Sequence, residues 1–308
     1  MNLRQMKYFL ALAQELNFGR AAQRLHMAQP PLTRQIRALE NELGTVLFRR
    51  TPKGVELTAA GQALLDEVPN VLALTQRARE RAQLAGEGLI GRLDVGIFGS
   101  GVLDVIPRLL ADFHRQRPDV RLELHNMTKV EQLQALRERR ITVGFNRLVP
   151  AEPGLGVLTV LREPLMVGIP DGHPLCTQAA IQLHQLSNVP MILYPNTPLP
   201  GLAEEVTAAF LHEGARLEVA QTVEDVLTCV ALVASGFGCC ITTRSAMSLR
   251  LPGVVYRPLR SRHLQDIELC CLHRSDDHSP VLAAFLDVVR AFSAQQEKMT
   301  RRSVARKI

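Results

Sequence analysis

The chain of 308 residues contains no tryptophan and three tyrosines, and aromatic residues make up 4% of it. This scarcity disfavours a pocket built to stack a large aromatic ring. The sequence also lacks the Gly-x-Ser-x-Gly, His-Glu-x-x-His and Gly-x-x-x-x-Gly-Lys-Ser/Thr motifs of three large enzyme classes. We therefore expect neither an enzyme nor a cofactor.

Cysteines at metal-binding spacing are also missing. The six cysteines include the adjacent pairs Cys239-Cys240 and Cys270-Cys271, and no Cys-x-x-Cys occurs. Adjacent residues of a strand point to opposite faces, so the pairs indicate neither a metal site nor a disulfide framework. We expect buried, reduced thiols, with a redox-sensing thiol as an alternative.

An uncharged run of 18 residues, 226–243, has the length of a membrane span. It contains three Thr, one Ser and two Gly, which favours a core helix followed by a buried strand. The first residues lack the apolar segment and cleavage site of a secretory signal. We expect a cytoplasmic protein without a membrane partner.

Positive charge is concentrated at the two ends of the chain. Residues 1–60 hold nine bases and four acids, and residues 298–308 hold five bases and no acid. Residues 91–297 hold 19 bases and 22 acids. A basic N-terminal region on a near-neutral body indicates a polyanionic partner for that region.

The first 60 residues predict three helices and a hairpin. Asn17 is suited to cap the second helix, and the Pro30-Pro31 pair suits the start of the third, which Gly44 ends. Two short strands, 47–50 and 55–57, flank a Pro/Gly turn. The apolar stripe expected on the third helix is Leu32, Ile36, Leu39 and Leu43.

The opposite face of the third helix is polar. Its Gln and Arg side chains can form paired hydrogen bonds with base edges in a major groove, and Thr33 suits a phosphate oxygen. Bases on the hairpin would flank the DNA backbone as a wing. The predicted DNA-binding residues are Gln29, Pro30, Pro31, Thr33, Arg34, Arg37, Arg49, Arg50 and Lys53.

Residues 58–86 predict one long helix capped by Thr58, with a kink or a break at Pro69 because proline removes a backbone hydrogen bond. Alternating strands and helices then predict a parallel α/β sheet with crossover helices, and a disordered tail from Thr300. The expected strands are 93–98, 120–126, 142–145, 163–169, 191–194, 217–220, 239–242 and 267–273, and the expected helices are 102–116, 129–139, 201–212, one from 226, and 280–294.

Polar residues follow several of these strands. A ligand of an α/β domain binds at the carboxyl ends of strands, where helix N-termini offer N–H groups to anions. Hydroxyls, an amide and one arginine there suit a small carboxylate, although Ser100 and Thr128 are equally suited to cap helices. The candidate ligand contacts are Ser100, Thr128, Asn146, Arg147, Pro195, Asn196 and Thr197.

Segments 17–26, 29–40, 47–50 and 54–61 closely resemble the N-terminal domain of LysR-type transcriptional regulators. The resemblance implies a winged helix-turn-helix over 1–58, a dimerising linker helix over 59–87 and a two-lobed effector domain of periplasmic-binding-protein type over 88–308. Lobe I would hold 88–162 and 268–296, lobe II 163–267, and a basic tail 297–308. Where the family usually has Ser, this chain has Ala28, so one phosphate-contacting hydroxyl is missing.

Within the family, segments 125–129, 143–147 and 193–195 look most like the regulators of catechol, chlorocatechol and benzoate degradation. That resemblance implies activation by cis,cis-muconate or a chlorinated relative, with contacts at Ser100, Thr128, Asn146 and the 195–198 loop.

We therefore predict a homo-oligomeric regulator, a dimer of dimers by family resemblance. It would bind promoter DNA, sense a small carboxylate and control an aromatic-compound catabolic operon, with RNA polymerase as a further partner. Two alternatives stay open: a redox-sensing regulator that uses a cysteine, and a solute-binding or metabolic α/β protein with an unrelated helical cap.

Overall fold

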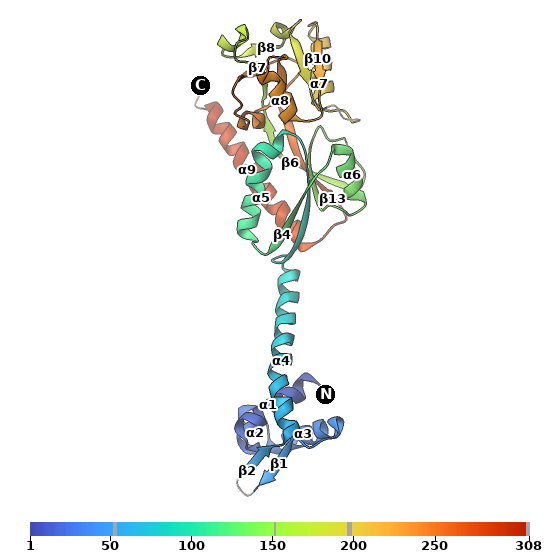
Figure 1. Ribbon diagram of the computed structural model, residues 1–308, viewed down its shortest axis with the longest axis vertical. Coiled ribbons are helices and arrows are strands. Elements are labelled where there is room, and N and C mark those ends of the chain that lie inside the picture. The colour runs from blue at the N-terminus through green and yellow to red at the C-terminus, as the bar shows by residue number, and fades with distance from the viewer. Residues whose placement is uncertain (52–53, 151, 196–198, 306–308) are drawn as a thin grey trace. The chain divides into compact units, whose positions relative to one another are not determined.

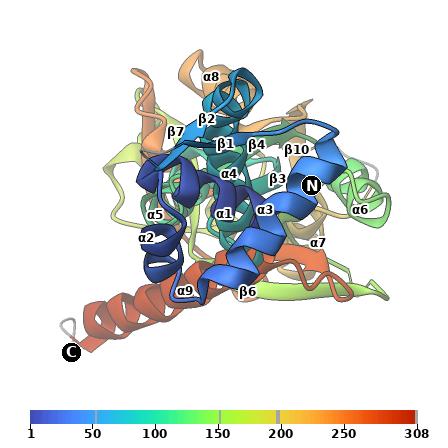
Figure 2. The same ribbon diagram turned by 90° about the horizontal axis from the view of Figure 1, so that it is seen from below.

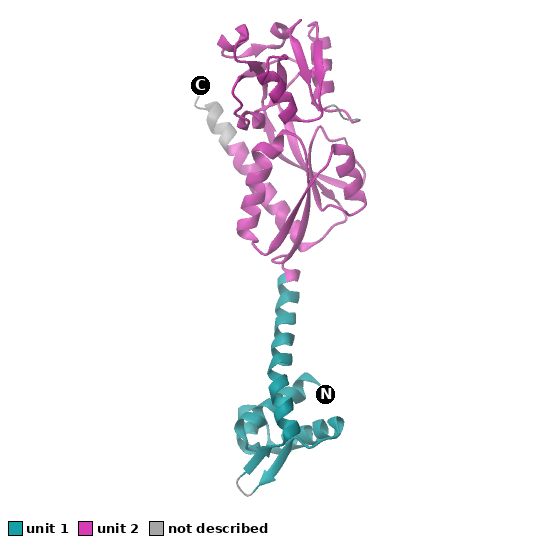
Figure 3. Ribbon diagram, in the orientation of Figure 1, with its two compact units in different colours: residues 1–84 teal, residues 85–308 magenta. Residues whose placement is uncertain are grey.

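The computed structural model describes residues 1–51, 54–150, 152–195 and 199–305, without the side chains of 299–305 (Figure 1). It contains two compact units, residues 1–84 and residues 85–308, which we call unit 1 and unit 2 (Figure 3). Among the described helices, none combines the length and the apolar character that a membrane crossing requires.

Three helices form the core of unit 1. They are α1 (Leu3–Glu15), α2 (Phe18–Arg24) and α3 (Gln29–Leu43). Asn17 caps α2 by accepting the backbone N–H of Gly19 at 2.9 Å, and Gly44 ends α3 with a φ of 68°, as predicted. Leu43 is 39% exposed, so its predicted place in the buried stripe is wrong. The fully buried side chains at this core include Phe9, Leu12, Leu32, Ile36 and Leu39.

A hairpin and a long helix complete unit 1. Strands β1 (Phe48–Thr51) and β2 (Gly54–Leu57) pair antiparallel. Helix α4 (Ala59–Gly86) begins at Thr58, whose Oγ1 accepts the backbone N–H of Gly61 at 3.0 Å. The helix runs through Pro69 without interruption, so the expected break into two segments does not occur.

Unit 2 contains two lobes. Lobe I is built on a five-stranded sheet in the order β4-β3-β5-β13-β6. Strand β3 runs parallel to β4 and β5, whereas β13 pairs antiparallel with β5 and β6, so the prediction of a purely parallel sheet is wrong. The strands are β3 (Gly91–Ile97), β4 (Val120–Asn126), β5 (Val143–Arg147), β6 (Leu155–Glu163) and β13 (Ile267–Arg274).

Helices cover both faces of the lobe I sheet (Figure 1). On one face α5 (Val105–Gln116) and α9 (Pro280–Ala305) pack together, with the rings of Phe113 and Phe285 centred 5.1 Å apart. On the other face lies α6 (Lys129–Arg137). A short 3₁₀ helix, η1 (Ser100–Leu103), replaces the first turn predicted for α5. Helix α9 continues to Ala305, so the tail predicted to be disordered from Thr300 is helical up to that residue.

Lobe II holds a four-stranded sheet in the order β11-β7-β12-β8 and a parallel pair of strands, β9 and β10. Strands β6, β8 and β12 were not predicted from the sequence. Short 3₁₀ helices cover 174–177, 183–186 and 244–248. The remaining elements are β7 (Leu165–Pro170), β8 (Ile181–Gln182), β9 (Pro190–Leu193), α7 (Leu202–His212), β10 (Glu218–Thr222), α8 (Val226–Ala234), β11 (Cys240–Thr243) and β12 (Val254–Arg260).

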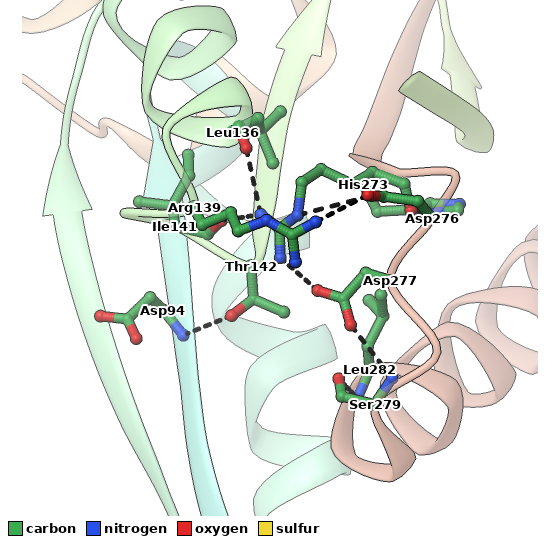
Figure 4. Close-up of polar contacts among 11 residues, drawn as sticks. Asp94, Leu136, Arg139, Ile141, Thr142, His273, Asp276, Asp277, Ser279 and Leu282 are labelled. Atoms are coloured by element: carbon green, nitrogen blue, oxygen red, sulfur yellow. Dashed lines mark hydrogen bonds and ion pairs between the residues drawn. The ribbon is translucent and has the colours of Figure 1, made fainter. Parts of the chain in front are cut away.

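A buried arginine joins three elements of lobe I. Nη1 of Arg274, at the end of β13, donates to the carbonyls of Leu136 and Ile141 at 3.1 and 2.8 Å, and Nη2 bonds the carboxylate of Asp277. Figure 4 shows the polar contacts of this cluster, which also include the exposed ion pair of Arg139 and Asp276. Arg274 thereby ties the C-terminal end of α6 to the turn before α9.

Candidate functional site

Helix α3 presents two different faces. Leu32, Ile36 and Leu39 are at most 2% exposed because they pack into the core of unit 1. Thr33 and Pro31 are half-buried, and Oγ1 of Thr33 donates to the carbonyl of Gln29 at 3.1 Å. Figure 2 shows α3 in the foreground of unit 1. Its exposed candidate residues are Gln29, Pro30, Arg34 and Arg37.

The start of α3 has no side-chain cap. Ala28 occupies the cap position in an extended conformation, and no side-chain oxygen accepts the first N–H groups there. Prolines at the first helical positions reduce the number of N–H groups that need a partner. Since Pro30 and Pro31 have no backbone N–H, the start of α3 offers fewer donors to an anion such as a phosphate than most helix starts do.

The hairpin adds exposed positive charge to unit 1. Arg49 and Arg50 are exposed on β1, and the guanidinium of Arg50 lies 5.5 Å from the ring centre of Phe18 at the start of α2. Arg49 stands opposite Glu56 in the strand register. Lys53, the third predicted base of the wing, lies outside the described residues.

Unit 2 holds a cavity between its lobes. It measures about 620 Å³ with its open mouth included. Of the predicted contacts, Ser100, Asn146, Arg147 and Pro195 line it, and Asn196 and Thr197 lie outside the described residues. The other lining residues are Phe98, Gly99, Lys129, Leu148, Tyr194, Gly201, Leu202, Glu224, Asp225, Val226, Thr243 and Ile267.

Thr128 is not among the residues that line the cavity. Its Oγ1 accepts the backbone N–H of Glu131 at 3.4 Å and donates to the Glu131 carboxylate at 2.9 Å. Thr128 therefore caps α6, which is the alternative that the sequence left open for it.

Buried hydrogen bonds lie around the cavity, and one of them joins lobe I to lobe II. Ser100 Oγ lies 2.7 Å from Thr243 Oγ1, and both residues are at most 4% exposed. Asn146 is also buried, and its Nδ2 donates to Gln132 Oε1 within lobe I at 2.8 Å. The hydroxyl of Tyr194 bonds that of Thr242, and burial raises the pKa of Tyr194 well above its usual value. These groups are neutral and held in place, which suits recognition of a polar ligand.

Two cations face the same cavity. Arg147 forms an ion pair with Glu163, whose other oxygen accepts the backbone N–H of Ser245 at 2.8 Å. Nη1 of Arg147 is buried without a hydrogen-bond partner in the described part of the chain. Lys129 is 7% exposed, and burial lowers its pKa. Lys129 is not among the contacts predicted from the sequence, because a lysine beside a helix cap looks like an ordinary solvated charge.

The cysteines form no metal site or disulfide. All six lie in described segments and are free, and five of them are buried. Burial raises the pKa of Cys239 to about 12 and also raises that of Cys271, so these thiols stay protonated at neutral pH. Among the described residues, no group of three or more His, Cys, Asp or Glu could hold a metal ion.

Two protein families match most of the chain. The bacterial regulatory helix-turn-helix family of LysR type matches residues 3–62, and the LysR substrate binding domain matches residues 86–294. The regulator TcbR of Pseudomonas sp. strain P51 is 35% identical over 94% of this chain and 98% of its own length.

Solved structures are also similar to this chain. Full-length CbnR complexed with its target DNA superimposes with a TM-score of 0.86 at 34% identity, over 95% of this chain and 99% of that one. The effector binding domain of BenM with its effector benzoate gives a TM-score of 0.61 at 26% identity, over 67% of this chain and 94% of that one.

These matches extend over both units, which excludes a metabolic or solute-binding α/β protein with an unrelated helical cap. They also confirm the expected winged helix-turn-helix, long helix and α/β effector domain, within a family of regulators and not of enzymes. The chain belongs to the LysR family of bacterial transcriptional regulators.

Proposed function

We propose that this LysR-family protein binds operator DNA through α3 and controls transcription of an aromatic-compound catabolic operon. The observation that carries the proposal is the division of α3 into a covered leucine face and an exposed face with Gln29, Arg34 and Arg37. An α-helix fits the major groove, and arginine pairs with guanine edges there. The likeness to CbnR, which was solved with its target DNA, supports DNA binding by this chain.

The effector in this proposal is a small carboxylate, of which cis,cis-muconate is the first candidate. The cavity supports this class because Ser100, Asn146 and Arg147 offer hydrogen-bond donors within it. The similar effector domain of BenM was solved with benzoate, which is also a carboxylate. Pro195, Asn196 and Thr197 stay predicted contacts, whereas we assign Thr128 the role of a helix cap.

We propose a homo-oligomer, a dimer of dimers, with RNA polymerase as a partner at the promoter. The support within the chain is the exposed apolar surface of α4, where Leu74 is 61% exposed and Val71 and Leu84 are each 37% exposed. A helix that leaves such side chains in water is suited to pair with a second helix.

The test uses the full-length protein and DNA sites that it selects from a random pool. Fluorescence anisotropy should give at least about a thousandfold preference for the selected site over random DNA at 150 mM salt. Muconate should raise the melting temperature and change the footprint on the site. Equal affinity for selected and random DNA would refute the proposal.

The redox alternative has little support from the site. Cys239, Cys240 and Cys271 are buried, whereas redox-sensing thiols are exposed and ionise readily. Footprints taken with hydrogen peroxide and with muconate separate the two cases. A footprint that changes with peroxide alone would favour the redox alternative.

A further inference from the structure

The charged side chains that line the effector cavity differ in whether a partner or water compensates their charge. Four charged side chains line it: Lys129, Arg147, Glu224 and Asp225. Arg147 is paired with Glu163. Asp225 caps α8, where its oxygens accept the backbone N–H and the hydroxyl of the residue three positions later at 2.8 and 2.7 Å. Glu224 is exposed to water. Lys129 is thus the buried charge for which a counter-ion has to be identified.

Two neutral carbonyls hold the ammonium group of Lys129. Nζ donates to the carbonyl of Leu148 at 3.0 Å and to that of Pro200 at 2.6 Å. No carboxylate of the described residues lies within ion-pair distance of Nζ, and the residues outside the description include no Asp or Glu. The carboxylate that acts on Lys129 from a greater distance is Glu204, which is exposed and accepts the backbone N–H of Gly201 at 2.7 Å.

A buried ammonium without a counter-ion is costly, because carbonyl dipoles replace only part of its hydration. An ammonium carries three hydrogen atoms, and the two carbonyls accept two of them. The third can be donated to a ligand in the cavity that Lys129 lines. An anion placed there would supply the missing charge and complete the hydrogen bonding.

We propose that Lys129 is the cation that binds the carboxylate of the effector, with Arg147 acting as a hydrogen-bond donor whose charge Glu163 already balances. This inference rests on the proposed effector class and deepens it by naming the residue that selects for negative charge. Lys129 belongs to α6 in lobe I, and Pro200 precedes α7 in lobe II. An effector on Lys129 therefore binds a group that already joins the two lobes.

The experiment measures the affinity of full-length protein for cis,cis-muconate and for its uncharged dimethyl ester by isothermal titration calorimetry. The wild-type protein should prefer the acid. Lys129→Met should weaken binding of the acid about 10- to 100-fold, which is typical for loss of a charged hydrogen bond, and change binding of the ester little. If Lys129 had only a structural role, the variant would bind the acid and the ester more weakly by the same factor, because the cavity itself would be distorted.

Two further variants control the experiment. Lys129→Gln also removes the charge but keeps a hydrogen-bond donor for the carbonyl of Pro200. The same measurement can therefore be made on this variant if Lys129→Met does not fold. Arg250→Met removes one exposed positive charge outside the cavity and should leave the preference unchanged.

The outcomes separate this inference from the proposed function. A preference for the acid that persists in both Lys129 variants overturns the role of Lys129 and leaves the carboxylate effector intact. A wild-type protein that binds neither compound, or both equally, overturns the proposed muconate effector and the role of Lys129 together. Loss of the preference in both variants, with Arg250→Met unchanged, supports the inference.

Discussion

The two units hold their candidate contact residues in opposite ways. In unit 1 the residues come from one short stretch, 29–50, and most of them are exposed in the free protein. In unit 2 they come from segments as distant as Phe98 and Ile267, and Ser100, Lys129 and Asn146 are at most 7% exposed. The first arrangement suits a large partner, such as DNA, that binds to the surface of the protein. The second suits a small ligand that must be enclosed.

The difference also determines what a substitution measures. An exposed arginine on α3 makes few contacts within the protein, so its loss should change DNA binding and leave folding intact. A buried charge in unit 2 is held by several partners of the same chain, so its loss should change folding as well.

Arg274→Met should destabilise unit 2 strongly. The change removes one donor from the carbonyls of Leu136 and Ile141 and leaves Asp277 without its cation, in a largely buried cluster. Breaking a buried charge pair from one side typically costs about 3–5 kcal/mol of the free energy of unfolding. Urea unfolding of the full chain, followed by circular dichroism, measures this loss.

Arg139→Met is the matched control for that variant. Both arginines approach Asp276, but Arg139 and Asp276 are each 64% exposed and form a pair in contact with water (Figure 4). Exposed pairs contribute little, so the control should unfold close to the wild-type midpoint. Equal losses in the two variants would show that burial does not determine the strength of this cluster.

Arg34→Ala should weaken binding to a selected operator about 10- to 100-fold while changing binding to random DNA much less. The reason is that an arginine on the outer face of α3 reads base edges, which differ between sequences. Anisotropy titrations with the two DNAs give the ratio directly. The circular dichroism spectrum should stay that of the wild type, because Arg34 is exposed.

Arg49→Ala is the comparison within unit 1. Arg49 lies on the hairpin, where we expect a phosphate contact. Its loss should therefore lower the affinity for the selected operator and for random DNA by the same factor, and reduce the salt dependence of binding by about one ion. If Arg34→Ala also lowered the affinity for both DNAs by the same factor, Arg34 would contact the DNA backbone and not the bases.

The sequence predicts unit 1 better than unit 2 because the relevant signals are local. The helical spacing of Leu32, Ile36 and Leu39 lies within two turns, and Gly44 ends the helix four residues beyond Glu40. One error there was Leu43, since periodicity cannot tell where a core ends. The break that was one of two expectations at Pro69 also does not occur, because a single missing hydrogen bond does not break a helix whose neighbouring turns are intact.

In unit 2 the pairing partners are far apart in the chain. Strand β6 pairs with β13 more than a hundred residues later, and β12 pairs with β7, so neither pairing leaves a local pattern. Ser100, Asn146 and Arg147 were found because strand ends carry polar residues in this kind of sheet. Lys129 was missed because its role depends on the carbonyl of Pro200, which only the folded chain brings near it.

The smallest predicted effect is a difference in pH dependence between the two units. Burial lowers the pKa of Lys129 below the ordinary lysine value of 10.5, although the charge of Glu204 on α7 acts in the opposite direction. The other charged groups at the cavity are Arg147, Glu224 and Asp225. Only the protonated ammonium binds a carboxylate, so affinity for muconate should fall as the pH rises toward the pKa of Lys129.

Because that pKa is lowered, the fall should begin at a lower pH than an exposed lysine would produce. Apart from Lys53, the charged residues predicted to contact DNA in unit 1 are arginines, which stay protonated throughout this range, so DNA affinity should fall less than muconate affinity. Calorimetry and anisotropy between pH 7 and pH 9.5 measure both curves on one preparation. Lys129→Met should make the muconate curve flat, and a curve that keeps its slope in this variant would assign the titration to another group.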